Sequence, residues 1–79
     1  MPNIIIYTAP ACGYCVMAKR LLERKGASYQ EINIDSQPGL RSEIMQKTGR
    51  RTVPQIFIGE QHIGGFDDLY ALDQSGQLD

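Results

Sequence analysis

The first part of the chain alternates strand-like and helix-like segments, and this constrains the fold more than any other feature of the sequence. Residues 4–7 form a short apolar run, typical of a strand covered on both faces. Residues 13–25 then follow a helical period, with one apolar stripe made of Met17, Ala18, Leu21 and Leu22. Residues 29–34 predict a second strand. Such a strand, helix, strand unit normally forms a right-handed parallel crossover.

The middle of the chain predicts a second helix. Asp35-Ser36-Gln37-Pro38 resembles a helix start, because an Asp side chain can cap free N–H groups and Pro fits the first turn. We therefore expect a helix over residues 39–47, ended at Gly49.

The final part predicts a hairpin and a last helix. Residues 55–58 and 61–63 are strand-like, and Gly59-Glu60 between them suits a tight turn with Gly first. Asp67 is expected to cap the last helix and Gly76 to end it. The order is then β-α-β-α-β-β-α, which predicts an α/β fold with a four-stranded mixed sheet and helices on both faces.

Length and composition limit the functional classes. A chain of 79 residues is expected to form a single domain, residues 1–79. The apolar run at residues 4–7 is too short to span a membrane or to form a signal-peptide core, so we expect a cytoplasmic protein with no membrane partner. Eight basic and nine acidic residues give a net charge of −1, which argues against nucleic-acid binding.

The two cysteines, Cys12 and Cys15, stand where the first strand leads into the first helix. Metal binding is not expected, since a structural zinc site needs four ligands and only His62 could join the pair. The C-x-x-C spacing beside a βαβ pattern is typical of a redox motif. Cys12 would lie at the helix N-terminus, where free N–H groups stabilise a thiolate. Cys15 would be more buried and could attack a mixed disulfide on Cys12. The alternative is a pair of inert core cysteines.

Two further segments allow two interpretations each. Pro54 in Thr52-Val53-Pro54 could be an ordinary trans turn former or a cis proline that exposes the preceding backbone to a peptide, and the rarity of cis bonds favours trans. Residues 64–68, Gly-Gly-Phe-Asp-Asp, could be a simple turn and cap. They could also hold an amino-acid zwitterion, with helix N–H groups for the carboxylate and Asp68 for the ammonium. His62 is expected at the surface.

Three motifs in order give the chain a close resemblance to the glutaredoxin family, in a dithiol C-G-Y-C variant of the bacterial glutaredoxin 3 type. They are Y-T-x-x-x-C-x-Y-C over residues 7–15, T-V-P-Q-I-F-I over residues 52–58 and H-I-G-G-x-D-D-L-Y-A-L over residues 62–72. The resemblance implies a thioredoxin-like fold and a monomer that carries out glutathione-dependent thiol–disulfide exchange. The implied partners are glutathionylated or disulfide-containing proteins, with ribonucleotide reductase among the candidates.

The resemblance also implies roles for individual residues. Cys12 becomes the nucleophile and Cys15 the resolving thiol. Glutathione, the cosubstrate, is then expected to contact Tyr14, Thr52, Val53, Pro54, Gly65, Phe66, Asp67 and Asp68, with Pro54 in cis.

Two departures from the family pattern open further hypotheses. The family usually has Lys at the position of Ala9, and Arg51 or Arg50 could replace its charge. Gly13 stands where most dithiol members have Pro, and members without that proline include dimers that share a [2Fe–2S] cluster through the first cysteine, here Cys12. An iron–sulfur carrier is therefore the alternative function. A third class is an electron donor to ribonucleotide reductase that is reduced by thioredoxin reductase instead of glutathione.

Overall fold

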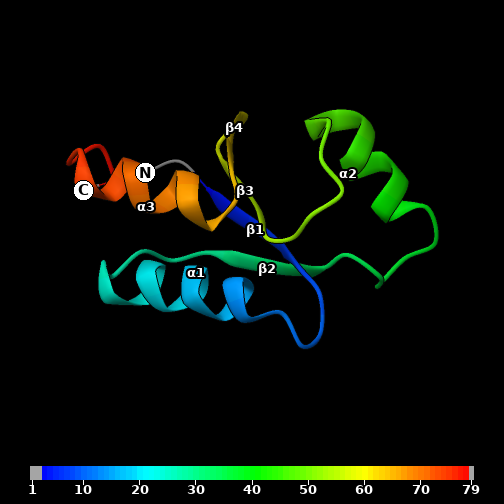
Figure 1. Ribbon diagram of the computed structural model, residues 1–79, viewed down its shortest axis with the longest axis horizontal. Helices are drawn as coiled ribbons and strands as arrows, with labels where there is room; N and C mark the ends of the chain where they lie inside the picture. The colour runs from blue at the N-terminus through cyan, green and yellow to red at the C-terminus, as the bar shows by residue number, and fades with distance from the viewer. Residues whose placement is uncertain (1–2, 79) are drawn as a thin grey trace.

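The computed structural model describes residues 3–78, which form one sheet with three helices (Figure 1). The elements in chain order are β1 (Ile4–Thr8), α1 (Gly13–Arg24), β2 (Gln30–Asn33), α2 (Leu40–Thr48), β3 (Gln55–Ile58), β4 (Gln61–Gly64) and α3 (Phe66–Gln74). The predicted order and α/β class are confirmed, with element ends within two residues of the predicted ones.

The sheet is mixed, in the order β2-β1-β3-β4. Strand β1 pairs in parallel with β2, as the crossover through α1 requires, and antiparallel with β3. Strands β3 and β4 form the predicted hairpin, whose turn begins at Gly59 with a φ of 60°. The central position of β1 explains its apolar sequence, because both of its faces are covered.

The core lies between the sheet and the pair α1 and α3, which run side by side (Figure 1). Its buried members come from the sheet and from these two helices: Ile4, Ile6, Ala18, Leu21, Leu22, Ile56 and Leu69. On the opposite face the Tyr7 ring meets the Phe57 ring edge-on at 5.9 Å, and Lys47 of α2 lies 5.0 Å above the Phe57 ring. Helices therefore cover both faces, as predicted.

Both predicted Asp caps are wrong. Helix α3 begins at Phe66 with Gly65 as its N-cap, so Asp67 lies inside the first turn. The carboxylate of Asp68 instead accepts a hydrogen bond from the Gly65 N–H, at 2.9 Å. Helix α2 has Gly39 as its N-cap, with no side chain bonded to it. Asp35 is too far upstream, and its carboxylate pairs with the Arg41 side chain at 2.9 Å.

Two predicted side-chain environments also differ. Met17 was placed on the apolar stripe of the first helix, but its side chain is 45% exposed, and Cys15 takes part in the buried face in its place. His62 is half-buried rather than a surface residue. Its Nε2 lies 2.7 Å from Oε1 of the fully buried Gln55, and its ring is 5.1 Å from that of Phe57. Burial lowers the pKa of His62.

Within residues 3–78, no helix combines the length and the apolar character needed to cross a membrane.

Candidate active site

Cys12 forms the N-cap of α1, directly after the turn that follows β1. Ala11 takes a left-handed conformation, with a φ of 57°, and turns the chain into the helix. The Cys12 sulfur then accepts a hydrogen bond from the backbone N–H of Cys15 at 3.2 Å. A free N–H at a helix start is the group that stabilises an anion there. The predicted position of Cys12, at the N-terminus of the first helix, is therefore confirmed.

Cys15 lies one turn into α1 and differs sharply from Cys12 in its surroundings. Its side chain is only 2% exposed, whereas Cys12 is half-buried, and both are free thiols. The pKa of Cys15 is raised to about 11. Burial is the largest cause of this increase, and the hydrogen bond with Cys12 is the next. Cys15 is therefore a protonated thiol at neutral pH, held next to a more accessible sulfur.

The loop before β3 approaches the cysteines from another part of the chain. The Cys12 Sγ lies 3.7 Å from the Val53 carbonyl oxygen. The Val53–Pro54 peptide bond is cis, as the resemblance implied, although the residues alone favoured trans. The buried Gln55 side chain holds this loop by donating to the Thr52 carbonyl oxygen at 2.8 Å. The loop of residues 52–54 thus lies beside the Cys12 sulfur, with Thr52 exposed, Val53 half-buried and Pro54 buried.

The turn between β4 and α3 is held by Asp68. Its Oδ2 accepts from the Gly65 N–H and from the Arg50 side chain, both at 2.9 Å. These two contacts, the backbone N–H first, lower the pKa of Asp68. Gly64 has a φ of 123°, and a side chain there would collide with the Asp68 carboxylate. The ionised Asp68 and the N-terminus of α3 form a polar end to the site.

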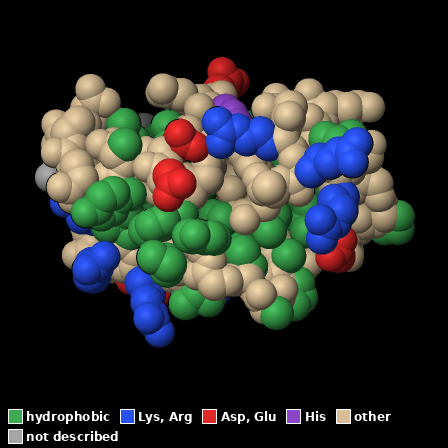
Figure 2. Space-filling model, in the orientation of Figure 1, with side chains coloured by type: hydrophobic (Ala, Val, Ile, Leu, Met, Phe, Trp, Pro, Cys, Tyr) green, Lys and Arg blue, Asp and Glu red, His purple; other side chains and the backbone are tan. Residues whose placement is uncertain are grey.

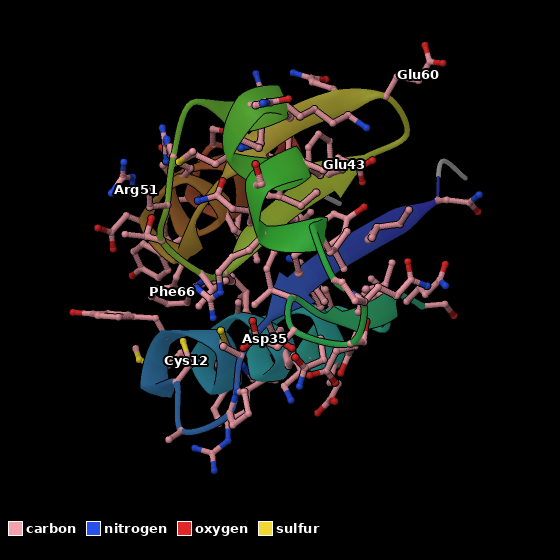
Figure 3. All side chains as sticks on the ribbon, turned by 90° about the vertical axis from the view of Figure 1, so that its right-hand side faces the viewer. Cys12, Asp35, Glu43, Arg51, Glu60 and Phe66 are labelled. Atoms are coloured by element: carbon pink, nitrogen blue, oxygen red, sulfur yellow. The ribbon has the colours of Figure 1, made fainter. Side chains whose placement is uncertain are left out.

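An aromatic surface joins the cysteines to this polar end. The exposed Tyr14 ring stacks on Phe66 at 6.3 Å, and Phe66 contacts Tyr70 at 6.0 Å. Figure 2 shows apolar side chains gathered along the seam between α1 and α3. In Figure 3, Cys12, Phe66 and Arg51 lie on the same side of the molecule.

The structure thus gathers most of the predicted site residues around Cys12. Asp67 is exposed at the start of α3. Arg51 is exposed as well, and no hydrogen bond or ion pair joins it to another side chain in the described range 3–78. Two supporting contacts were not predicted: the ion pair of Arg50 with Asp68 and the hydrogen bond of Gln55 to the loop. The sequence signal for the second was a polar Gln between the Val53-Pro54 pair and the apolar residues 56–58.

Comparison with known proteins identifies the family. The glutaredoxin family profile matches residues 4–63. The chain belongs to the glutaredoxin family. A glutaredoxin from Pseudomonas aeruginosa is 56% identical over 79 residues, which cover the whole of this chain and 94% of that protein. Glutaredoxin 3 of Escherichia coli strain K12 is 57% identical and is covered to 95% of its length.

Solved structures agree with this assignment. The solution structure of a glutaredoxin from Brucella melitensis has a TM-score of 0.88 and 56% identity, covering all of this chain and 86% of that one. A buckwheat glutaredoxin–glutathione complex has a TM-score of 0.89 and 37% identity, covering 95% of this chain and 71% of that one. The fold of this glutaredoxin is thus the thioredoxin-like one expected. With its C-x-x-C pair, it is a dithiol glutaredoxin, a glutathione-dependent thiol–disulfide oxidoreductase with glutathione as cosubstrate.

Proposed function

We propose that Cys12 is the nucleophile and Cys15 the resolving thiol of this glutaredoxin. The observation that carries the assignment is the difference between the two sulfurs. Cys12 is more accessible, stands at the start of α1 and accepts an N–H hydrogen bond there, so it is the sulfur that a disulfide substrate can reach. Cys15 is buried and protonated at neutral pH, so it reacts only with a sulfur already bonded to Cys12.

Two reaction routes follow from this assignment. In the first, the Cys12 thiolate attacks the glutathione sulfur of a protein–glutathione mixed disulfide, and the protein thiolate leaves. A second glutathione then attacks the glutathione sulfur on Cys12 and departs as oxidised glutathione, so Cys12 is regenerated. In the second route, Cys12 attacks a disulfide of a protein, and Cys15 displaces that protein to leave a Cys12–Cys15 disulfide. Two glutathione molecules reduce this bond.

We further propose that glutathione lies along the aromatic surface, with its backbone paired to Val53. The close approach of the Cys12 sulfur to the Val53 oxygen supports this placement, because a peptide attached to Cys12 would meet this loop. The contacts proposed for the rest of the molecule are Tyr14, Thr52, Pro54, Phe66 and Asp67. The γ-glutamyl end would reach Gly65 and Asp68 at the start of α3, where the N-terminus of the helix suits a carboxylate and the Asp68 carboxylate suits an ammonium group.

The experiment is a glutathione-coupled reduction of two substrates, a small glutathione mixed disulfide and a protein disulfide. We expect Cys12→Ser to abolish both activities. We expect Cys15→Ser to retain much of the first activity and to lose the second. A Cys12→Ser variant that remained active would show that the roles are assigned to the wrong cysteines.

Arg51 is proposed to supply part of the positive charge that the family's usual Lys provides at the position of Ala9. Its exposure on the side of the molecule that carries Cys12 supports the proposal (Figure 3). Arg50 is a weaker candidate, because its charge is already paired with Asp68. Arg51→Ala should raise the Michaelis constant for glutathione about two- to fivefold, as expected for one exposed ionic contact. An unchanged constant would contradict this role.

The setting and partners remain proposals as well. We propose that the chain acts as a monomeric single domain in the cytoplasm, where glutathione keeps thiols reduced. Its protein substrates are those typical of glutaredoxins, with ribonucleotide reductase as a specific candidate. Turnover of that enzyme with glutathione, NADPH and glutathione reductase tests the candidate. Turnover with NADPH and thioredoxin reductase alone would favour the alternative electron donor.

The [2Fe–2S] carrier stays an alternative prediction, because a cluster shared by two chains would use Cys12 of each chain. Anaerobic purification with glutathione tests it: visible absorbance of a bound cluster would support it. A colourless protein with high disulfide reductase activity would favour the dithiol enzyme.

A further inference from the structure

A surface cavity of about 440 Å³ reaches the cysteine pair away from the proposed glutathione contacts. Its lining comes from β1, the loop between β1 and α1, α1 and β2, and consists of Thr8, Ala9, Pro10, Ala11, Cys12, Gly13, Cys15, Val16, Lys19, Glu31 and Asn33. None of the residues proposed to hold glutathione belongs to it. The buried Cys15 therefore borders a second space, and Lys19 and Glu31 are the charged side chains in its lining.

Lys19 is fixed at this cavity by an ion pair. Its Nζ lies 3.1 Å from Oε2 and 3.3 Å from Oε1 of Glu31, across from α1 to β2. The hydroxyl of the buried Thr8 donates to the same Oε2 at 2.8 Å. These two contacts, with Thr8 first, lower the pKa of Glu31, so it remains an anion. Three elements thus combine to hold one ammonium group in place.

Lys19 faces the side of Cys15 because the two residues are four apart on α1, one turn of the same helix face. When Cys15 attacks, its sulfur develops negative charge in a buried position, where charge is disfavoured. Burial raises the pKa of Cys15 overall, and the charge of Lys19, after a backbone hydrogen bond at Ala9, acts in the opposite direction. Two other ionisable groups lie around this sulfur: Cys12, and Glu31, which is the partner of Lys19. Among the residues that line the cavity, β1 contributes only Thr8, whose hydroxyl is not charged.

We propose that Lys19 is a positioning residue for the resolving half of the dithiol reaction, holding a positive charge where the Cys15 sulfur develops a negative one. The proposal rests on the roles assigned above to the two cysteines. In this step a bond forms between the Cys15 and Cys12 sulfurs, and the bond from Cys12 to the substrate sulfur breaks. The Cys15 proton ends on the departing thiolate, so no outside oxidant or reductant is required.

The test isolates the resolving step. Full-length protein with glutathione bonded to Cys12 is prepared, and mass spectrometry confirms that Cys12 carries it. Release of glutathione on closure of the Cys12–Cys15 disulfide is then followed by rapid acid quenching. Lys19→Met should slow closure about three- to tenfold. Loss of the nearby cation lowers the fraction of Cys15 thiolate, and the higher nucleophilicity of the remaining thiolate offsets this loss only in part. Lys19→Arg should restore most of the rate.

Matched measurements separate this role from a structural one. Arg20→Met removes a neighbouring positive charge that does not line the cavity, and it should leave closure unchanged. In a Cys15→Ser background, Lys19→Met should leave reduction of a small glutathione mixed disulfide unchanged. Closure at the parent rate in Lys19→Met would overturn the proposal, and so would equal losses in both reactions. Glutathione found on Cys15 instead of Cys12 would refute the assigned cysteine roles, whatever Lys19 does.

Discussion

The backbone N–H of Cys15 donates a hydrogen bond to the sulfur of Cys12 over 3.2 Å. The two cysteines are three residues apart, so the helix start that presents the first sulfur also buries the second. One short segment thereby creates two chemically different thiols from the same side chain. The roles proposed for the two cysteines therefore rest on the difference in burial between their side chains.

The ionisation of Cys15 can be checked by titration. In the variant Cys12→Ser, Cys15 is the remaining thiol, and burial should keep its pKa above the ordinary value of 9.0. Loss of the hydrogen bond with Cys12 removes one cause of the increase, so we expect a value between 9.0 and about 11. Ultraviolet absorbance of the thiolate measures it. The variant Cys12→Ser/Cys15→Ser supplies the tyrosine background to subtract, and a midpoint below 9.0 would contradict the buried thiol.

Asp68 should matter for glutathione more than for the thiol chemistry. Asp68→Asn removes the charge that would hold an ammonium group, so the Michaelis constant for glutathione should rise about tenfold, the worth of one charged hydrogen bond. Steady-state kinetics with varied glutathione measures this. Glu60→Gln is the control, because Glu60 lies exposed in the hairpin turn, away from Cys12 (Figure 3). A response of Glu60→Gln equal to that of Asp68→Asn would indicate a general charge effect instead.

Gly64 should be intolerant of any side chain. Gly64→Ala combines a φ of 123° with a collision against Asp68, and we expect it to lower the free energy of unfolding by more than about 1 kcal/mol. Urea unfolding measures the loss. Gly26→Ala is the matched control, since Gly26 also has a positive φ, 69°, but has open space around it. Equal losses would show that backbone strain alone is responsible.

Helix α1 contains one residue, Met17, whose burial the helical period predicts wrongly, and this can be tested. Leu22 is fully buried and Met17 is 45% exposed, although both fall on the predicted stripe. Leu22→Ala should lower the free energy of unfolding by about 2–5 kcal/mol, and Met17→Ala should change it by less than about 0.5 kcal/mol. Comparable losses in thermal or urea unfolding would place Met17 in the core after all.

The fold was predictable because its strong signals are local. The apolar run of β1, the helical period of α1 and the Gly59 turn each determine an element without help from distant residues. The start of α1 was predicted correctly, but the caps of α2 and α3 were not, because capping depends on which backbone group a carboxylate reaches. Asp35 suits a cap by residue type, yet it pairs with Arg41. Gly65 takes the N-cap position expected of Asp67, and the Asp68 carboxylate accepts from the Gly65 N–H.

The site was predictable only in part, for a related reason. Cys12 and Cys15 carry their chemistry in a local motif, so their roles could be proposed from spacing and position. The cis bond at Pro54 was indicated only by the family resemblance, because cis bonds are rare and the local sequence alone favours trans. The contact of Lys19 with Glu31 joins residues twelve apart on different elements, which no local pattern specifies.

The burial of Cys15 also sets the route of electrons through the molecule. In the oxidised enzyme the shared bond would present one reachable sulfur, that of Cys12, to an incoming reductant. A substrate and a reductant must then use the same atom in turn, and neither can bypass it. Electrons would therefore enter and leave through the same sulfur, so the enzyme would react with only one exchange partner at a time.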